Sequence, residues 1–301
     1  MNNNNIKDKL NPYWVTGLID AEVCFYVRLV KSKNYKIGWW TQACFQLGFH
    51  IRDKDLLLQV KSFFNEVGNI YIYNKTVLYQ VRNLNEITET IIPHFENYPL
   101  ITQKQSDFSL FKEIVKLMDK SEHLNKKGLI KIINLKSSLN KGLSNELIYN
   151  FPNIIKAERP KVDLPVIIDY NWIAGFFTGE GCFSIGIYRR TYNNICYNVS
   201  LRITISQHFR DKSLMNSLMN TLNCGILSKH HENAVVLTIS RFNDIYNKII
   251  PLFNEYEIKG TKALDFCEVA KLINEKTHLI PEGLEEIRKI KLNMNKKRYI
   301  K

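Results

Sequence analysis

The 301-residue sequence predicts an α+β fold made of two pseudo-symmetric units, each with a four-stranded antiparallel sheet that helices cover on one face. Two observations lead to this prediction: one short pattern occurs twice, and alternating apolar residues follow each copy. Residues 14–25 read WVTGLIDAEVCF and residues 172–183 read WIAGFFTGEGCF, which places Glu22 and Glu180 at an offset of 158 residues. Because a long, fixed offset indicates two copies of one unit, the duplicated acid is the first candidate for chemistry.

The repeat extends far beyond the short pattern. Equivalent pairs include Lys104 with Lys262, Asp107 with Asp265 and, at a second offset of 155 residues, Asn140 with Asn295. We therefore expect four segments: 1–120 as the first unit, 121–168 as a helical tail and linker, 169–274 as the second unit, and 275–301 as a C-terminal helical tail.

Each copy of the pattern is expected to form a helix. Asn11 and Pro12 supply an N-cap and a first-turn residue, and Asp169 stands at the equivalent place before the second copy. Further helical stretches are expected at 52–67, 84–98 and about 103–118 in the first half, and at 209–222 in the second. Each unit thus runs helix, hairpin, helix, hairpin, helix, helix.

The strands are indicated by alternation of apolar and polar residues. The positions expected to face the core are Phe25, Val27, Leu29, Phe45, Leu47, Phe49, Val77, Tyr79 and Val81, then Phe183, Ile185, Ile187, Leu201, Ile203, Ile205, Val235, Leu237 and Ile239. The opposite face of each sheet is then left for solvent or a partner.

Composition narrows the classes of function. The net charge of +13 and the isoelectric point near 9.3 favour a polyanionic partner over a small neutral metabolite, although a merely soluble basic protein is the alternative. The six cysteines have no C-x-x-C or zinc-ligand spacing, so they are expected to be reduced. No apolar run reaches the length of a membrane span, and residues 1–10 lack the features of a signal or transit peptide, so no membrane partner is expected.

The outward faces of the two sheets mix arginine, glutamine, serine and tyrosine. A solvated polar face is the ordinary interpretation, but this mixture on two related sheets favours reading of base edges in a DNA major groove. The expected DNA-binding positions are Cys24, Tyr26, Arg28, Val30, Ser32, Trp40, Gln42, Cys44, Gln46, Gly48, Leu78, Gln80 and Arg82 on the first sheet, and Cys182, Ser184, Gly186, Tyr188, Arg190, Arg202, Thr204, Lys229, Val236, Thr238 and Ser240 on the second.

Small residues four positions apart line one face of each motif helix: Gly17 and Ala21 in the first, Gly175 and Gly179 in the second. Two such faces can pack closely, which would bring the acids at the helix ends side by side. Like charges in that position call for a cation between them, so the pattern predicts a divalent metal site. The alternative is two unrelated surface glutamates that cap turns.

These residues resemble the LAGLIDADG homing endonucleases, in the single-chain form with two motifs, and especially those encoded in fungal mitochondrial introns. The resemblance covers nearly the whole chain: both motifs, the paired strands, the ITQK segment at 101–104 and the LNMNK segment at 292–296. It implies two αββαββα units whose sheets form a saddle over double-stranded DNA, in a monomer that is an internal pseudo-dimer in the mitochondrial matrix.

The resemblance also implies roles for single residues. Glu22 and Glu180 would be the metal-binding catalytic acids, and the backbone carbonyls of Ala21 and Gly179 would be further ligands. Lys104 and Lys262 would stabilise transition-state charge or orient water, with Gln207 as a pocket residue that positions solvent. The expected cofactor is Mg²⁺ or Mn²⁺, whereas Ca²⁺ is expected to support binding without cleavage.

Two positions depart from the family pattern. Val23 follows the first acid where glycine is usual, which raises the question of how Glu22 is aimed. Thr178 replaces the aspartate that the first copy has at Asp20, and little effect on chemistry is expected.

The main alternative is an intron maturase, which would bind intron RNA on the same scaffold. Retention of an acid in both motifs favours the nuclease. A DNA-binding regulator would normally add a helix-turn-helix, and the sequence shows no such segment.

Overall fold

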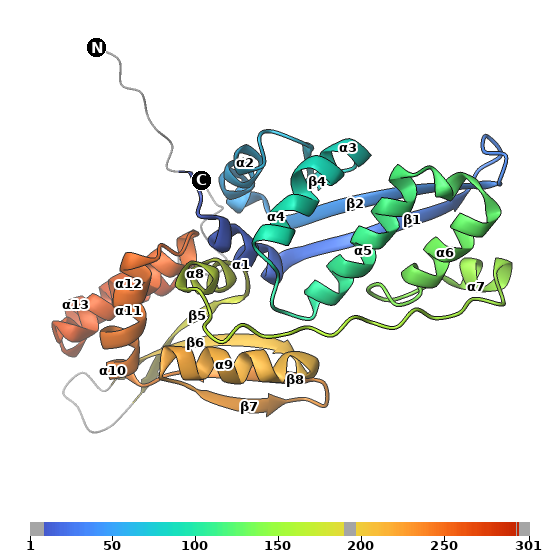
Figure 1. Cartoon of the computed structure of the whole chain (residues 1–301). Helices are drawn as coiled ribbons and strands as arrows, with labels where there is room; N and C mark the ends of the chain where they lie inside the picture. The colour runs from blue at the N-terminus through green and yellow to red at the C-terminus, as the bar shows by residue number, and fades with distance from the viewer. Residues whose placement is uncertain (1–8, 190–196, 293, 295–301) are drawn as a thin grey trace, which may run out of the picture. The chain divides into compact units, whose positions relative to one another are not determined.

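The computed structural model describes residues 9–189, 197–292 and 294, with the backbone alone for 261–265. The chain forms two compact units, Met1–Pro165 and Val166–Lys301. The boundary between them lies inside the segment predicted as tail and linker. Each unit holds one four-stranded antiparallel sheet and its helices, which confirms the predicted α+β class (Figure 1).

The first unit follows the predicted order of elements. Its elements are α1 (Pro12–Glu22), β1 (Val23–Lys31), β2 (Trp39–His50), α2 (Lys54–Phe63), β3 (Asn69–Tyr73), β4 (Thr76–Val81), α3 (Leu84–Glu86), α4 (Ile92–Asn97), α5 (Lys104–Asp119), α6 (Lys126–Lys136) and α7 (Asn145–Asn150). A π-helical turn, Ile87–Ile91, joins α3 to α4. The chain then continues from 151 to 169 without helix or strand.

The second unit repeats this order. Its elements are α8 (Tyr170–Glu180), β5 (Cys182–Arg189), β6 (Tyr197–His208), α9 (Lys212–Leu222), β7 (Ile226–His230), β8 (Ala234–Ile239), α10 (Phe242–Asp244), α11 (Ile250–Glu255), α12 (Thr261–Asn274) and α13 (Pro281–Leu292). The same π-helical turn recurs at Ile245–Ile249, so even this local irregularity is duplicated.

Each motif helix starts as its sequence predicts. The Asn11 side chain accepts hydrogen bonds from the backbone N–H groups of Tyr13 and Trp14, and Pro12 occupies the first turn. Asp169 caps α8 in the same way. Side-chain capping of this kind stabilises a helix by about 1 kcal/mol, so both motif helices begin at a defined residue.

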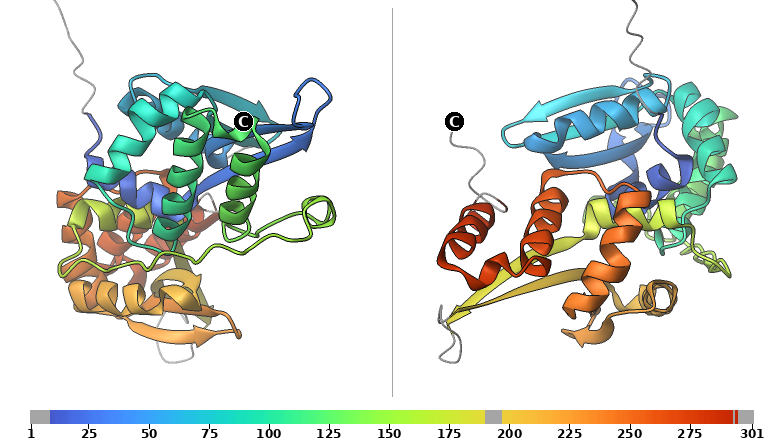
Figure 2. Two further views of the ribbon diagram at one scale, coloured as in Figure 1. Left: turned by 45° about the vertical axis from the view of Figure 1, so that its right-hand side comes forward. Right: turned by 90° about the vertical axis from the view of Figure 1, so that its left-hand side faces the viewer.

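The two sheets have the same strand order, β1-β2-β4-β3 and β5-β6-β8-β7. Phe25 pairs with Phe45, and Phe45 pairs with Val81, so the inward positions of three strands meet on one face. The expected alternation holds along β1, where Phe25, Val27 and Leu29 are buried. Helices cover this inward face of the first sheet, as the two views of Figure 2 show for α4 and α5.

Aromatic rings fill the core of each unit. In the first unit the ring of Phe25 lies 5.4–5.7 Å, centroid to centroid, from the rings of Phe45, Phe95, Phe108 and Phe111. In the second unit Phe183, the repeat mate of Phe25, lies 5.2 Å from Phe266 and 6.4 Å from Phe253. Each such pair contributes about 0.5–1.5 kcal/mol beyond its burial. The duplicated rings therefore hold each sheet against its helices at the point where the motif helix ends.

Candidate active site

The first motif acid stands where helix meets strand. Glu22 is the last residue of α1 and is exposed, and Val23 begins β1. Two residues earlier, the buried carboxylate of Asp20 accepts hydrogen bonds from Ile101 N (2.8 Å), Thr102 N (3.3 Å) and Thr102 Oγ1 (2.6 Å). Because charge-assisted hydrogen bonds are the strong ones, Asp20 fixes the loop that precedes α5 to the end of the motif helix.

This loop delivers Lys104 to the first motif. Lys104 N donates to Thr102 Oγ1 (3.1 Å), and Lys104 Nζ donates to the carbonyl oxygen of Ala21 (2.6 Å). The ammonium group of one predicted site residue thus contacts the carbonyl of another, directly before Glu22. A carbonyl oxygen has two lone pairs, so Ala21 could accept this bond and still ligate a cation.

The second motif has the same form with other side chains. Glu180 ends α8, and the N–H of Gly181 donates to Phe177 O (2.9 Å). Thr178, the repeat mate of Asp20, donates from its hydroxyl to Ala174 O (2.9 Å) and accepts from Lys259 N (3.1 Å). Thr178 thus bonds to the loop before α12 as Asp20 bonds to the loop before α5, although a hydroxyl replaces the carboxylate.

Three other predicted site residues lie in the second unit. Lys262 lies in the first turn of α12, and its side chain lies outside the described part of the chain. Gln207 is half-buried on β6 and pairs with the buried Val235, so it shares the core-side face of the second sheet. Gly179 is the penultimate residue of α8.

Valine at position 23 has an ordinary backbone conformation. Its φ of −76° and ψ of 150° are extended, as are the φ of −64° and ψ of 121° at Gly181. Neither turn needs a positive φ, which answers the conformational question that Val23 raises. What glycine provides at 181 is space, since a Cβ there would lie 2.3 Å from the carbonyl oxygen of Phe177.

Polar side chains on the outward face of the first sheet bond to one another. Gln80 donates to Gln46, Arg82 donates to Gln80, and the Arg82 guanidinium lies 5.2 Å from the ring centroid of Tyr71. Arg28 lies in a similar way over Trp40, at 5.9 Å. Gln80 is buried within this group of side chains, whereas Arg28 and Arg82 are exposed.

Cys44, predicted to contact DNA, is fully buried on that face. Tyr26 and Arg82 form side-chain hydrogen bonds with it, and burial raises the pKa of the Cys44 thiol and that of the Tyr26 hydroxyl, the latter to about 12. The alternation indicates its face correctly, but larger neighbours cover it. Cys44 is therefore not exposed in this structure, and its contact with DNA stays a prediction.

The second sheet has a more open outward face. Cys182, Tyr188 and Arg202 are exposed, and the ring of Tyr188 passes over Gly186, where a Cβ would lie 2.4 Å from it. The predicted contact residue Arg190 lies outside the described residues. The remaining predicted positions on this face, Ser184, Thr204, Val236, Thr238 and Ser240, are half-buried or exposed.

Lys229, predicted to bind DNA, lies on the helix-covered face of the second sheet. It pairs with Val235, whose side chain is buried on the helix-covered side. Lys229 also lines a hollow with Lys212 and Met219 of α9. Since paired residues in a sheet share one face, Lys229 belongs to the α9 side, and its role in DNA binding stays a prediction.

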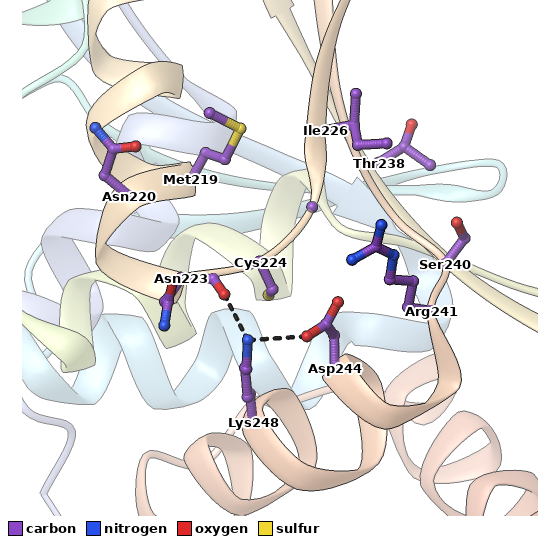
Figure 3. Close-up of a pocket in the computed structure, with 11 residues that line it drawn as sticks. Met219, Asn220, Asn223, Cys224, Ile226, Thr238, Ser240, Arg241, Asp244 and Lys248 are labelled. Carbon is purple, nitrogen blue, oxygen red and sulfur yellow. Dashed lines mark hydrogen bonds and ion pairs between the residues drawn. The ribbon is translucent and has the colours of Figure 1, made fainter.

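A hollow in the described part of the second unit lies at the edge of the sheet, and no residue of the motif helix α8 lines it. It has a volume of about 550 Å³, and Cys224, Thr238, Ser240 and Arg241 contribute to its wall (Figure 3). Lys248 Nζ donates to Asn223 O (2.6 Å) and pairs with Asp244 (2.9 Å) there. Neither motif acid is among the residues that line it.

A metal centre is not complete within the described side chains. No group of three or more His, Cys, Asp or Glu residues among them could hold a metal ion. The donors that the motifs offer are a carboxylate and a neighbouring backbone carbonyl in each unit. Such hard oxygen donors fit Mg²⁺ or Ca²⁺ and do not fit softer metals.

A polar cluster that was not predicted from the sequence lies one helical turn after Lys104, around Asp107. The buried carboxylate of Asp107 accepts from Arg159 Nη1 (2.8 Å) and from Asn140 N (2.9 Å), and Asn140 Nδ2 donates to Phe25 O (2.6 Å). Asp107 and Asn140 are both repeated positions, which is the signal that could have found them. Nothing in the sequence pattern points to Arg159.

Comparison with known proteins identifies the family. The family model described as LAGLIDADG endonuclease matches residues 15–115 and again 173–273. The chain belongs to this family, in the form that carries two copies of the domain.

Individual relatives agree. A protein of Neurospora crassa named "Probable intron-encoded endonuclease 2" is 38% identical to this chain, over 94% of this chain and 64% of its own length. A second protein of this organism, named "Probable intron-encoded endonuclease 3", is 37% identical, over 93% of this chain and 53% of its own length. The chain thus spans between half and two thirds of the length of these relatives. The crystal structure of the I-SmaMI LAGLIDADG homing endonuclease bound to cleaved DNA is 41% identical with a TM-score of 0.93, and covers 96% of this chain and 98% of that one. The crystal structure of I-LtrWI bound to target DNA is 37% identical to this chain, with a TM-score of 0.90. It covers 95% of this chain and 97% of that one.

Proposed function

We propose that this chain is a homing endonuclease that hydrolyses both strands of a long, asymmetric DNA site. The observation that carries the proposal is the duplicated arrangement at the motif ends: an acid closes each motif helix, and in the first unit Lys104 Nζ reaches the carbonyl directly before that acid. Membership of the LAGLIDADG family and the names of the relatives support it.

The chemistry follows from these groups. Hydrolysis of a phosphodiester needs an attacking water, a means to offset the developing negative charge, and a leaving oxygen in line with the attack. Glu22 and Glu180 would each serve one strand by holding a divalent cation, which supplies charge neutralisation and lowers the pKa of bound water.

The lysines and Gln207 would complete the two sites. The ammonium of Lys104 would orient water or offset charge at the first site, with its backbone held there through the hydroxyl of Thr102. Lys262, its repeat mate, would serve the second site in the same way, and Gln207 would position solvent. Because Phe49 stands where the repeat places the counterpart of Gln207, the two sites would not be equal.

We propose Mg²⁺ or Mn²⁺ as the working cofactor, held by the carboxylates of Glu22 and Glu180 with the carbonyls of Ala21 and Gly179. I-SmaMI has been crystallised on an uncleaved DNA target in the presence of calcium ions, which supports the expectation that Ca²⁺ permits binding without cleavage here. The proposal fits the donor set, because carboxylate and carbonyl oxygens are the ligands that these cations prefer.

The outward faces of the two sheets are proposed to read the DNA. Each half would cover about one helical turn of DNA, so that the whole site would be roughly 20 bp long. It would be asymmetric because Arg28, Gln46 and Arg82 on the first sheet have other residues as counterparts on the second, among them Thr204 and Ser240.

Mitochondria are the proposed place of action. Several relatives are named as intron-encoded endonucleases, and a 25% identical relative from Saccharomyces cerevisiae is named as a mitochondrial protein. These names support an origin in the mitochondrial genome.

A selection from a randomised DNA library tests the proposed function. The protein would be incubated with the library and Mg²⁺, and the cleaved molecules would be sequenced. We expect one long, asymmetric preferred site with cuts in both strands. A palindromic site would reject the model of two unequal halves, and an absence of cut DNA with Mg²⁺ and with Mn²⁺ would reject the nuclease.

Intron RNA is the alternative partner, since the net charge of +13 would serve RNA as well as DNA. Binding of a structured intron RNA with an affinity above that for the selected DNA, without cleavage of either, would favour the maturase.

Among the described residues, no helix is both long and apolar enough to cross a membrane.

A further inference from the structure

The segment between the two units is anchored beside the first motif by one side chain. Residues 151–169 form no helix or strand, yet Arg159 donates to three acceptors on separate parts of the first unit. These acceptors are Asp107 Oδ1 at 2.8 Å, the carbonyl oxygen of Ser138, and the carbonyl oxygen of Gln103 at 3.3 Å. A linker that only spans a distance would not need such an anchor.

The carboxylate of the ion pair at the centre of this anchor is buried, and the guanidinium is half-buried. The Asp107 side chain is 5% exposed and that of Arg159 is 29% exposed. Loss of Arg159 would leave the buried carboxylate of Asp107 without its compensating charge. Because Asp107 lies in the first turn of α5, the ion pair ties the start of this helix to the linker. A lysine could replace the charge but not the planar fork that serves several acceptors at once.

The third acceptor connects the anchor to Lys104. The Gln103 carbonyl belongs to the residue before Lys104, and Asp107 lies one helical turn after it. Arg159 therefore holds both sides of the backbone from which the Lys104 side chain extends to Ala21 O. A displacement of about 1 Å at a reacting group can cost on the order of 100-fold in rate.

We propose that Arg159 is a positioning residue for Lys104, so that the linker controls the rate at which one of the two DNA strands is cut. The proposal rests on the proposed endonuclease function and on the role of Lys104 at the first motif. Because Arg159 acts on the first unit, its loss should slow the strand served by Glu22 more than the strand served by Glu180, and nicked DNA should accumulate.

The test compares Arg159→Ala, Arg159→Lys and the control Lys161→Ala, which removes one positive charge from an exposed position on the same segment. Single-turnover cleavage of each strand would be followed with separate end labels, beside the thermal unfolding midpoint and DNA affinity in Ca²⁺. We expect Arg159→Ala to slow one strand at least about tenfold and the other by less than about twofold. Arg159→Lys should keep the unfolding midpoint near that of the parent and show the same strand bias, and Lys161→Ala should show none.

A purely structural role gives a different result. Equal slowing of both strands, or parental rates on both in a folded Arg159→Lys variant, would overturn the proposal. A second measurement does not depend on cleavage: the rate at which an amine-reactive reagent modifies Lys104 should rise in both Arg159 variants. If the parent protein cuts no DNA, the endonuclease proposal fails, while the reactivity of Lys104 still decides whether Arg159 positions it.

Discussion

The two motif ends reach the same backbone arrangement with different side chains. In the first unit the carboxylate of Asp20 accepts three hydrogen bonds from Ile101 and Thr102. In the second unit the hydroxyl of Thr178 accepts one, from Lys259 N, and donates back to its own helix. The contact that both units repeat is thus between the motif helix and the loop that follows the sheet, and in the first unit this contact depends on a buried charge.

The residue after each acid differs for a steric reason. Both positions are extended, but Val23 is accommodated with 7% exposure, whereas a Cβ at Gly181 would clash with Phe177 O at 2.3 Å. Substitution of each of these two residues by its counterpart should therefore have unequal effects. We expect Gly181→Val to lower the free energy of unfolding by more than about 3 kcal/mol, because the backbone must move to make room for the side chain. The same variant should cleave DNA much more slowly than the parent.

Its counterpart, Val23→Gly, should cost about 2 kcal/mol through the loss of a buried side chain and the added freedom of glycine. Unfolding in urea would measure both variants. Equal losses of stability in the two would show that the environments of positions 23 and 181 do not differ as described.

Removal of the Asp20 carboxylate should have the next largest effect. Asp20→Ala leaves the buried N–H groups of Ile101 and Thr102 without their acceptor, at a cost of about 3 kcal/mol, whereas Thr178→Ala should cost about 1 kcal/mol. Denaturant unfolding of both variants gives the two values. A cost for Thr178→Ala that matches Asp20→Ala would contradict the asymmetry of the two units.

A buried histidine makes the first unit sensitive to acid. His94 forms a hydrogen bond with Thr16 Oγ1 (3.1 Å), and burial lowers the pKa of its imidazole from 6.5 to about 4. The second unit has Leu252 and Ala174 at these places. Because the unfolded chain binds the proton more readily, this contribution to stability is present above pH 6.5 and is lost as the pH falls towards 4.

The loss should be on the order of 3 kcal/mol, and His94→Leu should remove this part of the pH dependence. Unfolding free energies measured between about pH 4 and pH 7 check the prediction. The same slope in the parent and in His94→Leu would show that another group is responsible.

On the outward face of the first sheet, a substitution is expected to change base preference and not stability. Arg82→Ala should relax base preference at a few neighbouring positions in one half of the site, at a cost of about 1–3 kcal/mol. Lys126→Ala, on the exposed start of α6, should instead weaken binding to all sequences alike and flatten the salt dependence. A cleavage-specificity profile for Arg82→Ala that equals the parent's at every position would reject the role of this side chain.

The elements could be predicted from the sequence because their signals are local and repeated. Asn11 and Asp169 cap their helices as expected, and the alternation indicates the inward faces around Phe25 and Phe183. Long-range contacts have no such signal. The anchoring of Arg159 at Asp107 joins positions 52 residues apart, and nothing in the irregular linker marks it.

The surroundings of two predicted DNA-binding residues on the sheets could not be predicted either. Alternation tells which face Cys44 occupies but not that Tyr26 and Arg82 cover it. The face of Lys229 could not be derived because β7 is short and polar, so no apolar pattern indicates its register against Val235. Placement of the two motif acids as one site stays a prediction.

Strand-resolved cleavage by Glu22→Gln and Glu180→Gln tests whether the two duplicated acids are the catalytic pair. Each change keeps the size of the side chain and removes the charge that would hold a divalent cation. We predict that either variant binds the selected DNA in Ca²⁺ with parental affinity and cleaves it in Mg²⁺ at least about 100-fold more slowly. Cleavage of both strands by either variant at a rate near that of the parent would contradict the assignment of the duplicated acids as the catalytic pair.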